Sequence, residues 1–270
     1  MPIDSLPPAI TPAVTKAGRT ALVLLTNGTT NPEGLGVLEE IDGWMRRRFS
    51  GSALCWALSS PRILAVLQGR GLAVRSLQDT LEHLNQQGFV AAVVQPLSVA
   101  SAGAAAPAVG NLRVQAGSPL LDGPAAVSKL IDILADRIDD AEPTVVAAHG
   151  SEDDVSAQQR LRGLVEKLEA RFPRLVVASL RGWPGTAPLQ RLREGGRESG
   201  RVHIVPLMLT AGHHVHMDIL GDHPQSWRHL LGGRDMRCSE PLGRNPAVLE
   251  IFAARIEAAR QSVLYRSELL

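Results

Sequence analysis

Residues 20–30 read TALVLLTNGTT, and residues 143–153 read PTVVAAHGSED. In each stretch an apolar run is followed by one polar residue, a glycine, and then threonine or serine. A short apolar run bounded by turn residues is typical of a strand buried on both faces of a parallel sheet. The two stretches therefore predict equivalent strands in the two halves of the chain.

A second pair of similar stretches follows the first pair in the same order. FVAAVVQPLSVASAG spans residues 89–103 and VHIVPLMLTAG spans residues 202–212, each with an apolar strand, Pro-Leu and then Ala-Gly. Chance agreement between short apolar strands is the alternative, but the repeated glycine and Pro-Leu landmarks favour a duplication. We predict an α/β fold of two similar lobes, each a parallel sheet flanked by helices, with a cleft between them beyond the carboxyl ends of the strands.

Hydrophobic periodicity places the remaining elements. Further strands are predicted over 175–179 and 202–207, and helices over 33–49, 74–87, 125–138, 157–171 and 245–265. We divide the chain into a flexible N-terminal arm (1–18), an N-terminal lobe (19–140) and a C-terminal lobe (141–270) that includes a histidine site and the closing helix. The boundary falls near 139–142. The closing helix could pack on its own chain or on another subunit, so a homo-oligomer is one expectation.

Composition limits the function classes. Hydrophobic residues make up 44% of the 270 residues and aromatic residues only 3%, so aliphatic side chains must build the core. The formal net charge of +1 argues against a general nucleic-acid binder. Cys55 and Cys238 are too few for a disulfide framework and are interpreted as reduced thiols. No segment has the ~20 apolar residues of a membrane span, and we expect a cytoplasmic protein without membrane contact.

Histidines are the main candidates for chemistry. His149 ends an apolar strand, where a functional ligand and a structural, hydrogen-bonded histidine are about equally expected. His213, His214 and His216 follow the strand at 202–207, and neutral imidazole is a common ligand of Co, Ni, Zn and Fe. If this stretch is extended, His214 and His216 share a side, whereas a helix would place His213 and His216 on one face. A solvated polar loop is the alternative.

Two turns are weaker candidates. The turn Asn27-Gly28-Thr29-Thr30 offers backbone N–H groups ahead of a helix, which makes it a candidate anion cradle. It lacks the lysine and spacing of a Walker motif, so no nucleotide cofactor is expected. The turn that begins at Arg181 (RGWPG) could be only a loop built by glycine and proline.

Several motifs together resemble the anaerobic (class II) sirohydrochlorin cobaltochelatase family of cobalamin biosynthesis. They are NGTTNPE, VVQPL, AAHGSE, RGWPG, VPLMLTAGHHVHMDILGD, SWR and LGRNPAVLEIF, and they cover nearly the whole chain after Arg19. Members of this family have two α/β lobes and insert Co(II) into an acidic tetrapyrrole. The resemblance implies that His149 and His214 are catalytic and bind the metal. It also implies a tetrapyrrole partner and a divalent metal substrate, with Co(II) expected and Fe(II) or Ni(II) as alternatives.

The chain departs from the family pattern at one metal position. The family's glutamate falls on Arg181, and a fixed cation ~5 Å from a divalent metal would repel it by about 6–7 kcal/mol at an effective dielectric of 20. His213 or His216 could replace that ligand, and Glu152, Asp153 or Asp154 could restore negative charge. Arg181 could instead bind a tetrapyrrole carboxylate.

Other pocket positions differ as well, because Ser98 stands where the family usually has histidine and Ala148 where glycine is usual. The expected substrate-binding residues are Asn27, Gly28, Thr29, Ser98 and Arg181. Two functions follow from the resemblance and its departures. The first is a chelatase that inserts Co(II) or a related metal into an acidic tetrapyrrole. The second is a chelatase-fold protein that binds a metal or tetrapyrrole with little or no insertion.

Overall fold

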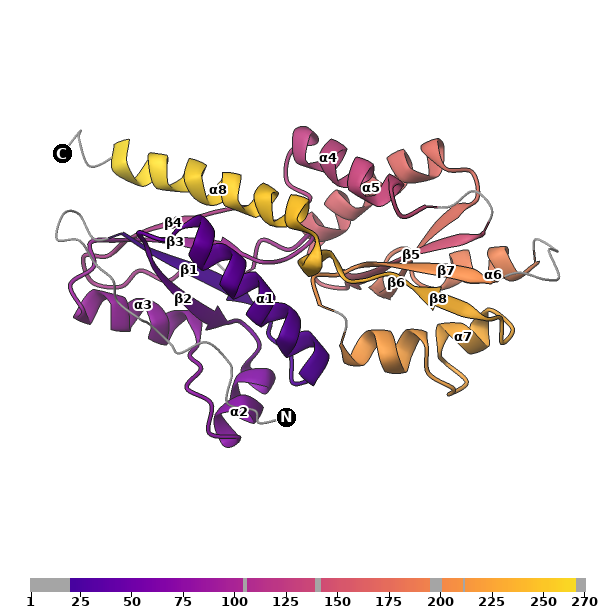
Figure 1. The fold of residues 1–270 in the computed structure, drawn as a ribbon, viewed down its shortest axis with the longest axis horizontal. Coiled ribbons are helices and arrows are strands. Elements are labelled where there is room, and N and C mark those ends of the chain that lie inside the picture. The colour runs from indigo at the N-terminus through magenta and orange to yellow at the C-terminus, as the bar shows by residue number, and fades with distance from the viewer. Residues whose placement is uncertain (1–19, 104–105, 139–141, 195–200, 211, 266–270) are drawn as a thin grey trace. The chain divides into compact units, whose positions relative to one another are not determined.

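A computed structural model describes residues 20–103, 106–138, 142–194, 201–210 and 212–265 (Figure 1). The predicted N-terminal arm (1–18) and most of the predicted boundary (139–141) lie outside these residues. The described chain forms two compact units. Unit 1 contains residues 20–98, 102–119 and 249–265, and unit 2 contains residues 99–101 and 120–248.

Unit 1 is built on a four-stranded parallel sheet in the order β2-β1-β3-β4. Its strands are β1 (Thr20–Thr26), β2 (Ala53–Leu58), β3 (Ala91–Pro96) and β4 (Arg113–Ala116). Its helices are α1 (Pro32–Arg48), α2 (Pro61–Gly69), α3 (Leu77–Gln86) and most of α8 (Pro246–Tyr265).

Unit 2 repeats this arrangement, with a four-stranded parallel sheet in the order β6-β5-β7-β8. The strands are β5 (Thr144–Ser151), β6 (Leu175–Gly182), β7 (Val202–Leu207) and β8 (Met236–Cys238). The helices are α4 (Pro124–Ala135), α5 (Val155–Arg171), α6 (Ala187–Glu194), a π-helix (His214–Ile219), α7 (Trp227–Leu230) and a 3₁₀-helix (Leu242–Arg244). Because β5 to β8 take the places of β1 to β4, the predicted pair of similar α/β lobes is confirmed.

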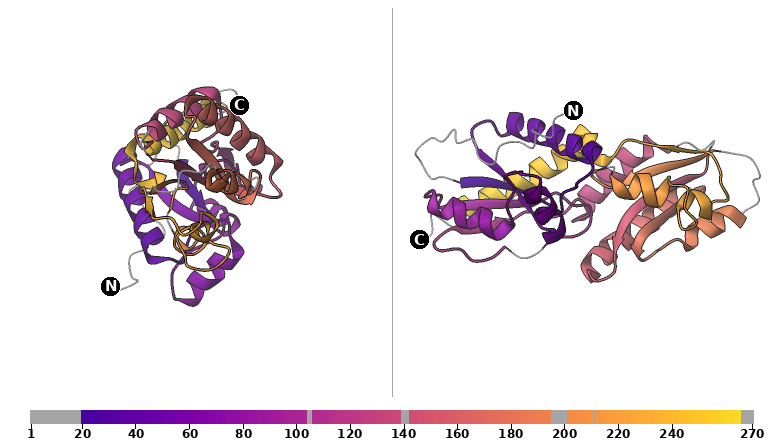
Figure 2. Two further views of the ribbon diagram at one scale, coloured as in Figure 1. Left: turned by 90° about the vertical axis from the view of Figure 1, so that its right-hand side faces the viewer. Right: turned by 90° about the horizontal axis from the view of Figure 1, so that it is seen from below.

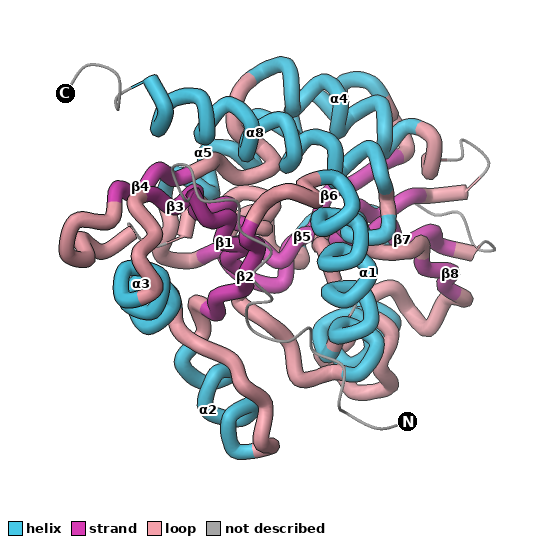
Figure 3. The backbone as a smooth tube through the Cα atoms, turned by 60° about the vertical axis from the view of Figure 1, so that its left-hand side comes forward, coloured by secondary structure: helices cyan, strands magenta, loops and turns pink. Residues whose placement is uncertain are grey.

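Both sheets are covered on their two faces, which explains the continuous apolar runs of their central strands. In unit 1, odd-numbered residues of β1 pack with α3, whereas the indole of Trp56 reaches Asp42 of α1 at 2.9 Å. Figure 3 shows α1 and α3 on opposite sides of this sheet. Arg48 of α1 contacts Glu257 of α8 at 2.6 Å, and the two helices lie side by side in Figure 2.

In unit 2, one face of the sheet packs against α6, the π-helix and α7. The residues of this core include Val145, Ile204, Leu189, Val215, Ile219 and Trp227. The π-helix is therefore anchored through Val215 and Ile219, which are both buried. This packing fixes the position of the helix turn that carries His214 and Asp218.

The structure differs from the predicted elements in several places. The closing helix was assigned to the C-terminal lobe, but residues 249–265 belong to unit 1, where Arg48 pairs with Glu257 and Glu250. Helix α3 begins after Ser76, whose side chain accepts the N–H of Asp79, so it starts three residues later than predicted. Strands β2, β4 and β8 and helices α2, α6 and α7 were not predicted.

The two cysteines are free thiols, as expected, with Cys55 buried and Cys238 exposed. Within the described part of the chain, no helix combines the length and the apolar character needed to cross a bilayer.

Candidate metal site

The site in unit 2 starts where β5 and β6 pair beyond their apolar runs. Gly150 faces Arg181 and Ser151 faces Gly182 across this extension. A Cβ on Gly150 would lie 1.9 Å from the carbonyl oxygen of Arg181, and one on Gly182 would lie 2.0 Å from that of Ser151. Both glycines also have a positive φ, a backbone conformation that residues with a side chain rarely adopt. The two glycines thus allow the backbones to approach and place His149 beside the Arg181 strand.

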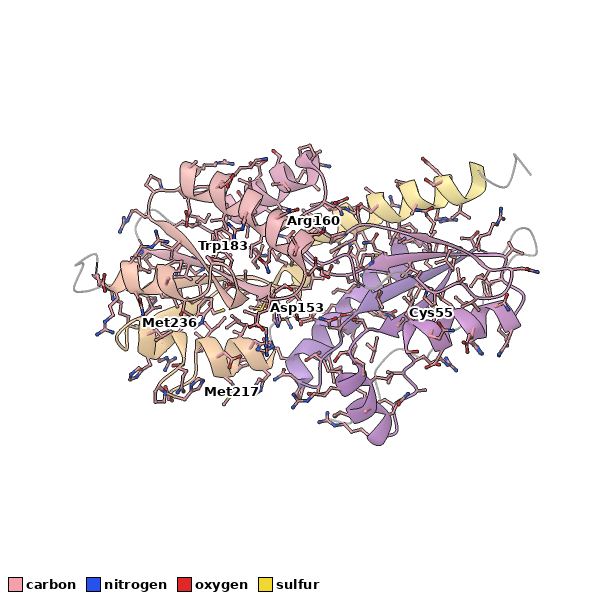
Figure 4. All side chains as sticks on the ribbon, turned by 180° about the vertical axis from the view of Figure 1, so that it is seen from behind. Cys55, Asp153, Arg160, Trp183, Met217 and Met236 are labelled. Carbon is pink, nitrogen blue, oxygen red and sulfur yellow. The ribbon has the colours of Figure 1, made fainter. Side chains whose placement is uncertain are left out.

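The turn after β6 is held by a buried serine. The Ser179 hydroxyl accepts the N–H of Gly185 at 2.9 Å and donates to the carbonyl of Gly182 at 3.3 Å. Trp183 in this turn lies beneath α5 (Figure 4), where the Arg162 guanidinium sits 4.4 Å from the centre of an indole ring. Arg181 remains exposed. The turn is therefore fixed by local contacts while its arginine stays available to a ligand.

The histidine stretch after β7 opens a π-helix, which decides between the two conformations considered above. His214 is its first residue, and the N–H of Leu220 donates to the carbonyl of Val215 at 2.9 Å, a five-residue spacing. Such helices occur often at functional sites. Because the chain is helical here, His214 and His216 do not point to one side as they would in a strand.

Asp218 is the residue in this helix that sequence reasoning missed. Its carboxylate lies 2.6 Å from Nδ1 of His214, one turn earlier, and both side chains are partly exposed (38% and 40%). The spacing His-x-x-x-Asp would have indicated the pair if a helix had been assumed, since residues four apart are neighbours on a helix.

The structure brings His149 and His214 into direct contact. Their ring centroids are 4.9 Å apart and the planes meet at 73°, an edge-to-face arrangement. Nδ1 of His149 lies 3.0 Å from the carbonyl of Gly150. A carbonyl and a carboxylate only accept, so both Nδ1 atoms act as donors. In the neutral form of either ring, the lone pair therefore lies on Nε2, the atom that can bind a metal.

Burial keeps His149 neutral. Desolvation is the largest cause that lowers the pKa of His149 below its usual value, while its bond to Gly150 raises it. The His214 ring and the Arg181 charge lower this pKa further, and the Asp218 charge raises it. A neutral imidazole at pH 7 can act either as a metal ligand or as a proton acceptor.

The other two predicted histidine ligands lie beside this pair. The ring of His213 is 6.0 Å from that of His214, and His213 and His216 are both exposed. Among the residues that the structure describes, no group of three or more His, Cys, Asp or Glu side chains is arranged to hold a metal ion. The structure thus assembles a histidine pair, and a role for His213 or His216 as a ligand stays a prediction.

In the acidic turn after His149, Asp154 stabilises the start of α5. Asp154 caps α5 by accepting the N–H of Ala157 at 2.8 Å, and it also accepts from the hydroxyl of Ser101 at 2.8 Å. The bond from Ala157 is the largest cause that lowers the pKa of Asp154. Glu152 and Asp153 are exposed. Of the three predicted sources of negative charge, Asp154 is therefore already committed to the helix and to Ser101.

The predicted anion cradle lies in unit 1, and much of it is occupied by its own side chains. Thr26 accepts the N–H of Gly28, and Thr29 accepts that of Asn31, both at 3.2 Å. Asn31 in turn accepts the N–H groups of Glu33 and Gly34 as the cap of α1. The Asn27 side chain is exposed and accepts from Ser59 at 2.5 Å.

Ser98 is half-buried just beyond β3, also in unit 1. Substrate binding by Asn27, Gly28, Thr29 and Ser98, and the cleft that these residues were expected to share with the histidines, stay predictions.

The sequence of this chain is similar to those of known metal chelatases. A family model described as cobalt chelatase (CbiK) matches residues 20–261. A sirohydrochlorin cobaltochelatase, CbiKC, from Nitratidesulfovibrio vulgaris is 26% identical, with 93% of this chain and 91% of that protein covered.

Two solved structures have a similar fold. SirB from Bacillus subtilis with Fe³⁺ has a TM-score of 0.59 and 18% identity, with 90% of this chain and 97% of that chain covered. The sirohydrochlorin chelatase SirB from Bacillus subtilis subspecies spizizenii, in complex with cobalt, has a TM-score of 0.56 and 16% identity, with 89% and 95% covered.

Proposed function

The chain belongs to the cobalt chelatase (CbiK) family, and we propose that it inserts Co(II) into sirohydrochlorin. The observation that carries the proposal for this site is the pair formed by His149 and His214, with the ring centroids 4.9 Å apart and both Nδ1 atoms engaged. Two histidines whose Nδ1 atoms are both engaged can present Nε2 to Co(II), for which imidazole is a good ligand.

The reaction exchanges one divalent ion for two pyrrole protons. Metal binding to a neutral histidine needs no prior loss of a proton, and a histidine that is released from the metal can accept a pyrrole proton. His149 suits both tasks because burial lowers its pKa and keeps it unprotonated near pH 7. His214 shares the metal and is held by Asp218.

Arg181 acts on the other substrate in this proposal. Its side chain is exposed near the end of β6, the strand that pairs with β5 beside His149. Sirohydrochlorin carries eight carboxylates, and a guanidinium can bind one of them with two parallel hydrogen bonds. Asn27, whose side chain is exposed in unit 1, stays a predicted substrate-binding residue.

Single substitutions of the histidines test the site. We expect His149→Ala and His214→Ala each to lower the rate of Co(II) insertion into sirohydrochlorin by at least about 100-fold, because each removes one of two ligands. His229→Ala is the matched control, since this exposed histidine lies in α7. The assignment fails if either site variant keeps the wild-type rate while its thermal unfolding is unchanged.

Two observations favour a second function, which is binding of a metal or tetrapyrrole without insertion. The positive charge of Arg181 is close enough to lower the pKa of His149, and it would repel a metal ion there. In addition, the described residues contain no group of three side chains arranged to hold a metal ion. A protein of this kind would change the tetrapyrrole spectrum only until about one macrocycle is bound per chain. If a small amount of protein goes on converting a larger amount of macrocycle, binding without insertion is excluded.

A further inference from the structure

Asp218 differs from the other acidic residues named above because its carboxylate contacts His214, one of the two paired histidines. Its Oδ2 atom lies 2.6 Å from Nδ1 of His214, whereas Asp154 is used as a helix cap and Asp222 pairs with Arg228 at 3.2 Å. Both His214 and Asp218 sit in the π-helix that is anchored by Val215 and Ile219. The carboxylate is thus fixed relative to the ring that it contacts.

The end of the π-helix is held so that this geometry is maintained. His223 Nε2 lies 2.9 Å from the carbonyl oxygen of Met217, to which it donates. A Cβ on Gly221 would lie 2.2 Å from the same oxygen, so the chain can turn here only with glycine. These contacts flank Asp218 and limit the positions that its carboxylate can take.

Charge gives the second argument. Histidine ligands bring no negative charge to a divalent ion, and Arg181 adds a positive charge on the strand next to His149. Asp218 brings a negative charge to the same histidine pair through its contact with His214. A carboxylate hydrogen-bonded to a metal-binding histidine also fixes the ring tautomer and makes Nε2 a stronger donor to the metal.

We propose that Asp218 is a positioning residue for the metal, which orients His214 through Nδ1 and supplies the negative charge that offsets Arg181. The inference rests on the proposed function in so far as His214 binds the metal. It predicts that Asp218 acts through His214, and that removing its charge weakens Co(II) binding even when no tetrapyrrole is present.

The test measures Co(II) affinity of the full chain by anaerobic calorimetry, with Co(II) alone as the probe. Replacing a residue that hydrogen-bonds a metal-binding histidine costs about 10–100-fold in metal affinity, so we expect Asp218→Asn to weaken Co(II) binding by that factor. Asp218→Ala, which also loses the acceptor for Nδ1, should weaken it further, and Asp218→Glu should restore part of it. Asp222→Asn is the matched control, with the same chemical change four residues later at an exposed site.

A second measurement separates a positioning role from a structural one. In a His214→Ala background, Asp218→Asn should have a much smaller effect on Co(II) affinity, because the ring that it orients is gone and only the effect of its charge remains. Thermal unfolding of each variant identifies any loss of affinity that comes from a damaged fold.

The proposal is overturned if Asp218→Asn binds Co(II) within about twofold of the wild type, or if it weakens binding equally with and without His214. Insertion into sirohydrochlorin by the wild type tests the proposed function separately. If the wild type binds Co(II) but inserts none, the affinity ratio still decides the role of Asp218.

Discussion

Charge reversal at Arg181 is the substitution whose effect depends most on the environment seen in the structure. Arg181 is the direct partner of Gly150 across the β5–β6 ladder, and His149 precedes Gly150. Adjacent strands lie about 4.8 Å apart, and we take about one and a half of these spacings, roughly 7 Å, as the distance between the Arg181 charge and a metal bound to His149. Since Arg181 is exposed, the effective dielectric is closer to that of water than to 20.

At about 7 Å and a dielectric of about 80, one pair of unit charges interacts by about 0.6 kcal/mol. A divalent ion doubles this energy, and replacing a cation by an anion doubles it again. Arg181→Glu should therefore strengthen Co(II) binding by about 2.4 kcal/mol, roughly 50-fold, and Arg181→Gln by about half that energy, roughly sevenfold. The repulsion of 6–7 kcal/mol expected from the sequence is too large because it assumed a shielded site.

The assay is calorimetric titration of Co(II) at low ionic strength, repeated with added salt, which should shrink the gain through screening. Arg191→Glu is the control: it makes the same change at an exposed position of α6, and its charge is not among those that act on His149. If Arg181 also binds a carboxylate, Arg181→Glu should raise the KM for sirohydrochlorin. The reasoning is refuted if Arg181→Glu leaves Co(II) affinity within twofold of the wild type, or if Arg191→Glu produces an equal gain.

Three further predictions concern titration, packing and thiol reactivity. The pKa of His149 is lower in the folded chain than in the unfolded chain. As pH falls below about 6.5, His149 is therefore protonated first in the unfolded chain, which stabilises the unfolded state. The free energy of unfolding, measured in urea, should therefore fall more steeply with decreasing pH in the wild type than in His149→Gln, and equal slopes would contradict this. Gly150→Ala should destabilise the fold by about 2–4 kcal/mol, against about 1 kcal/mol for Gly233→Ala, which shares the positive φ but has open space around it; equal losses in chemical denaturation would contradict the close approach to β6. Burial raises the pKa of Cys55 to about 12, so a thiol reagent should label only Cys238 in the native protein and both cysteines in denaturant; labelling of both in the native protein would be inconsistent with the structure.

The central strands could be predicted because their signal lies in the order of residues alone. The apolar runs at 20–26 and 202–207 coincide with β1 and β7. Strand β2 was missed because Cys55 and Trp56 interrupt its aliphatic run, and β8 has only three residues, too few to show a period. The extension of β5 and β6 was missed as well, since it depends on the backbones of Gly150 and Gly182 rather than on hydrophobicity.

The candidate site was predicted in part for a similar reason. His149 could be placed at the carboxyl end of a strand, and His214 was identified through the resemblance to the chelatase family. The contact between them depends on two loops that are distant in sequence, and no local pattern encodes it. Asp218 was missed because the sequence left open whether this stretch is extended or helical, and the four-residue spacing from His214 brings the two side chains together only in a helix.

Anaerobic absorbance spectroscopy of sirohydrochlorin with Co(II), beside a control without protein, tests the central claim most directly. The account predicts continued conversion of the macrocycle spectrum when the protein is present at much less than one chain per macrocycle, with loss of this activity in His149→Ala and His214→Ala. A spectral change that stops at about one macrocycle per chain, or a rate no higher than that of the control, would contradict it.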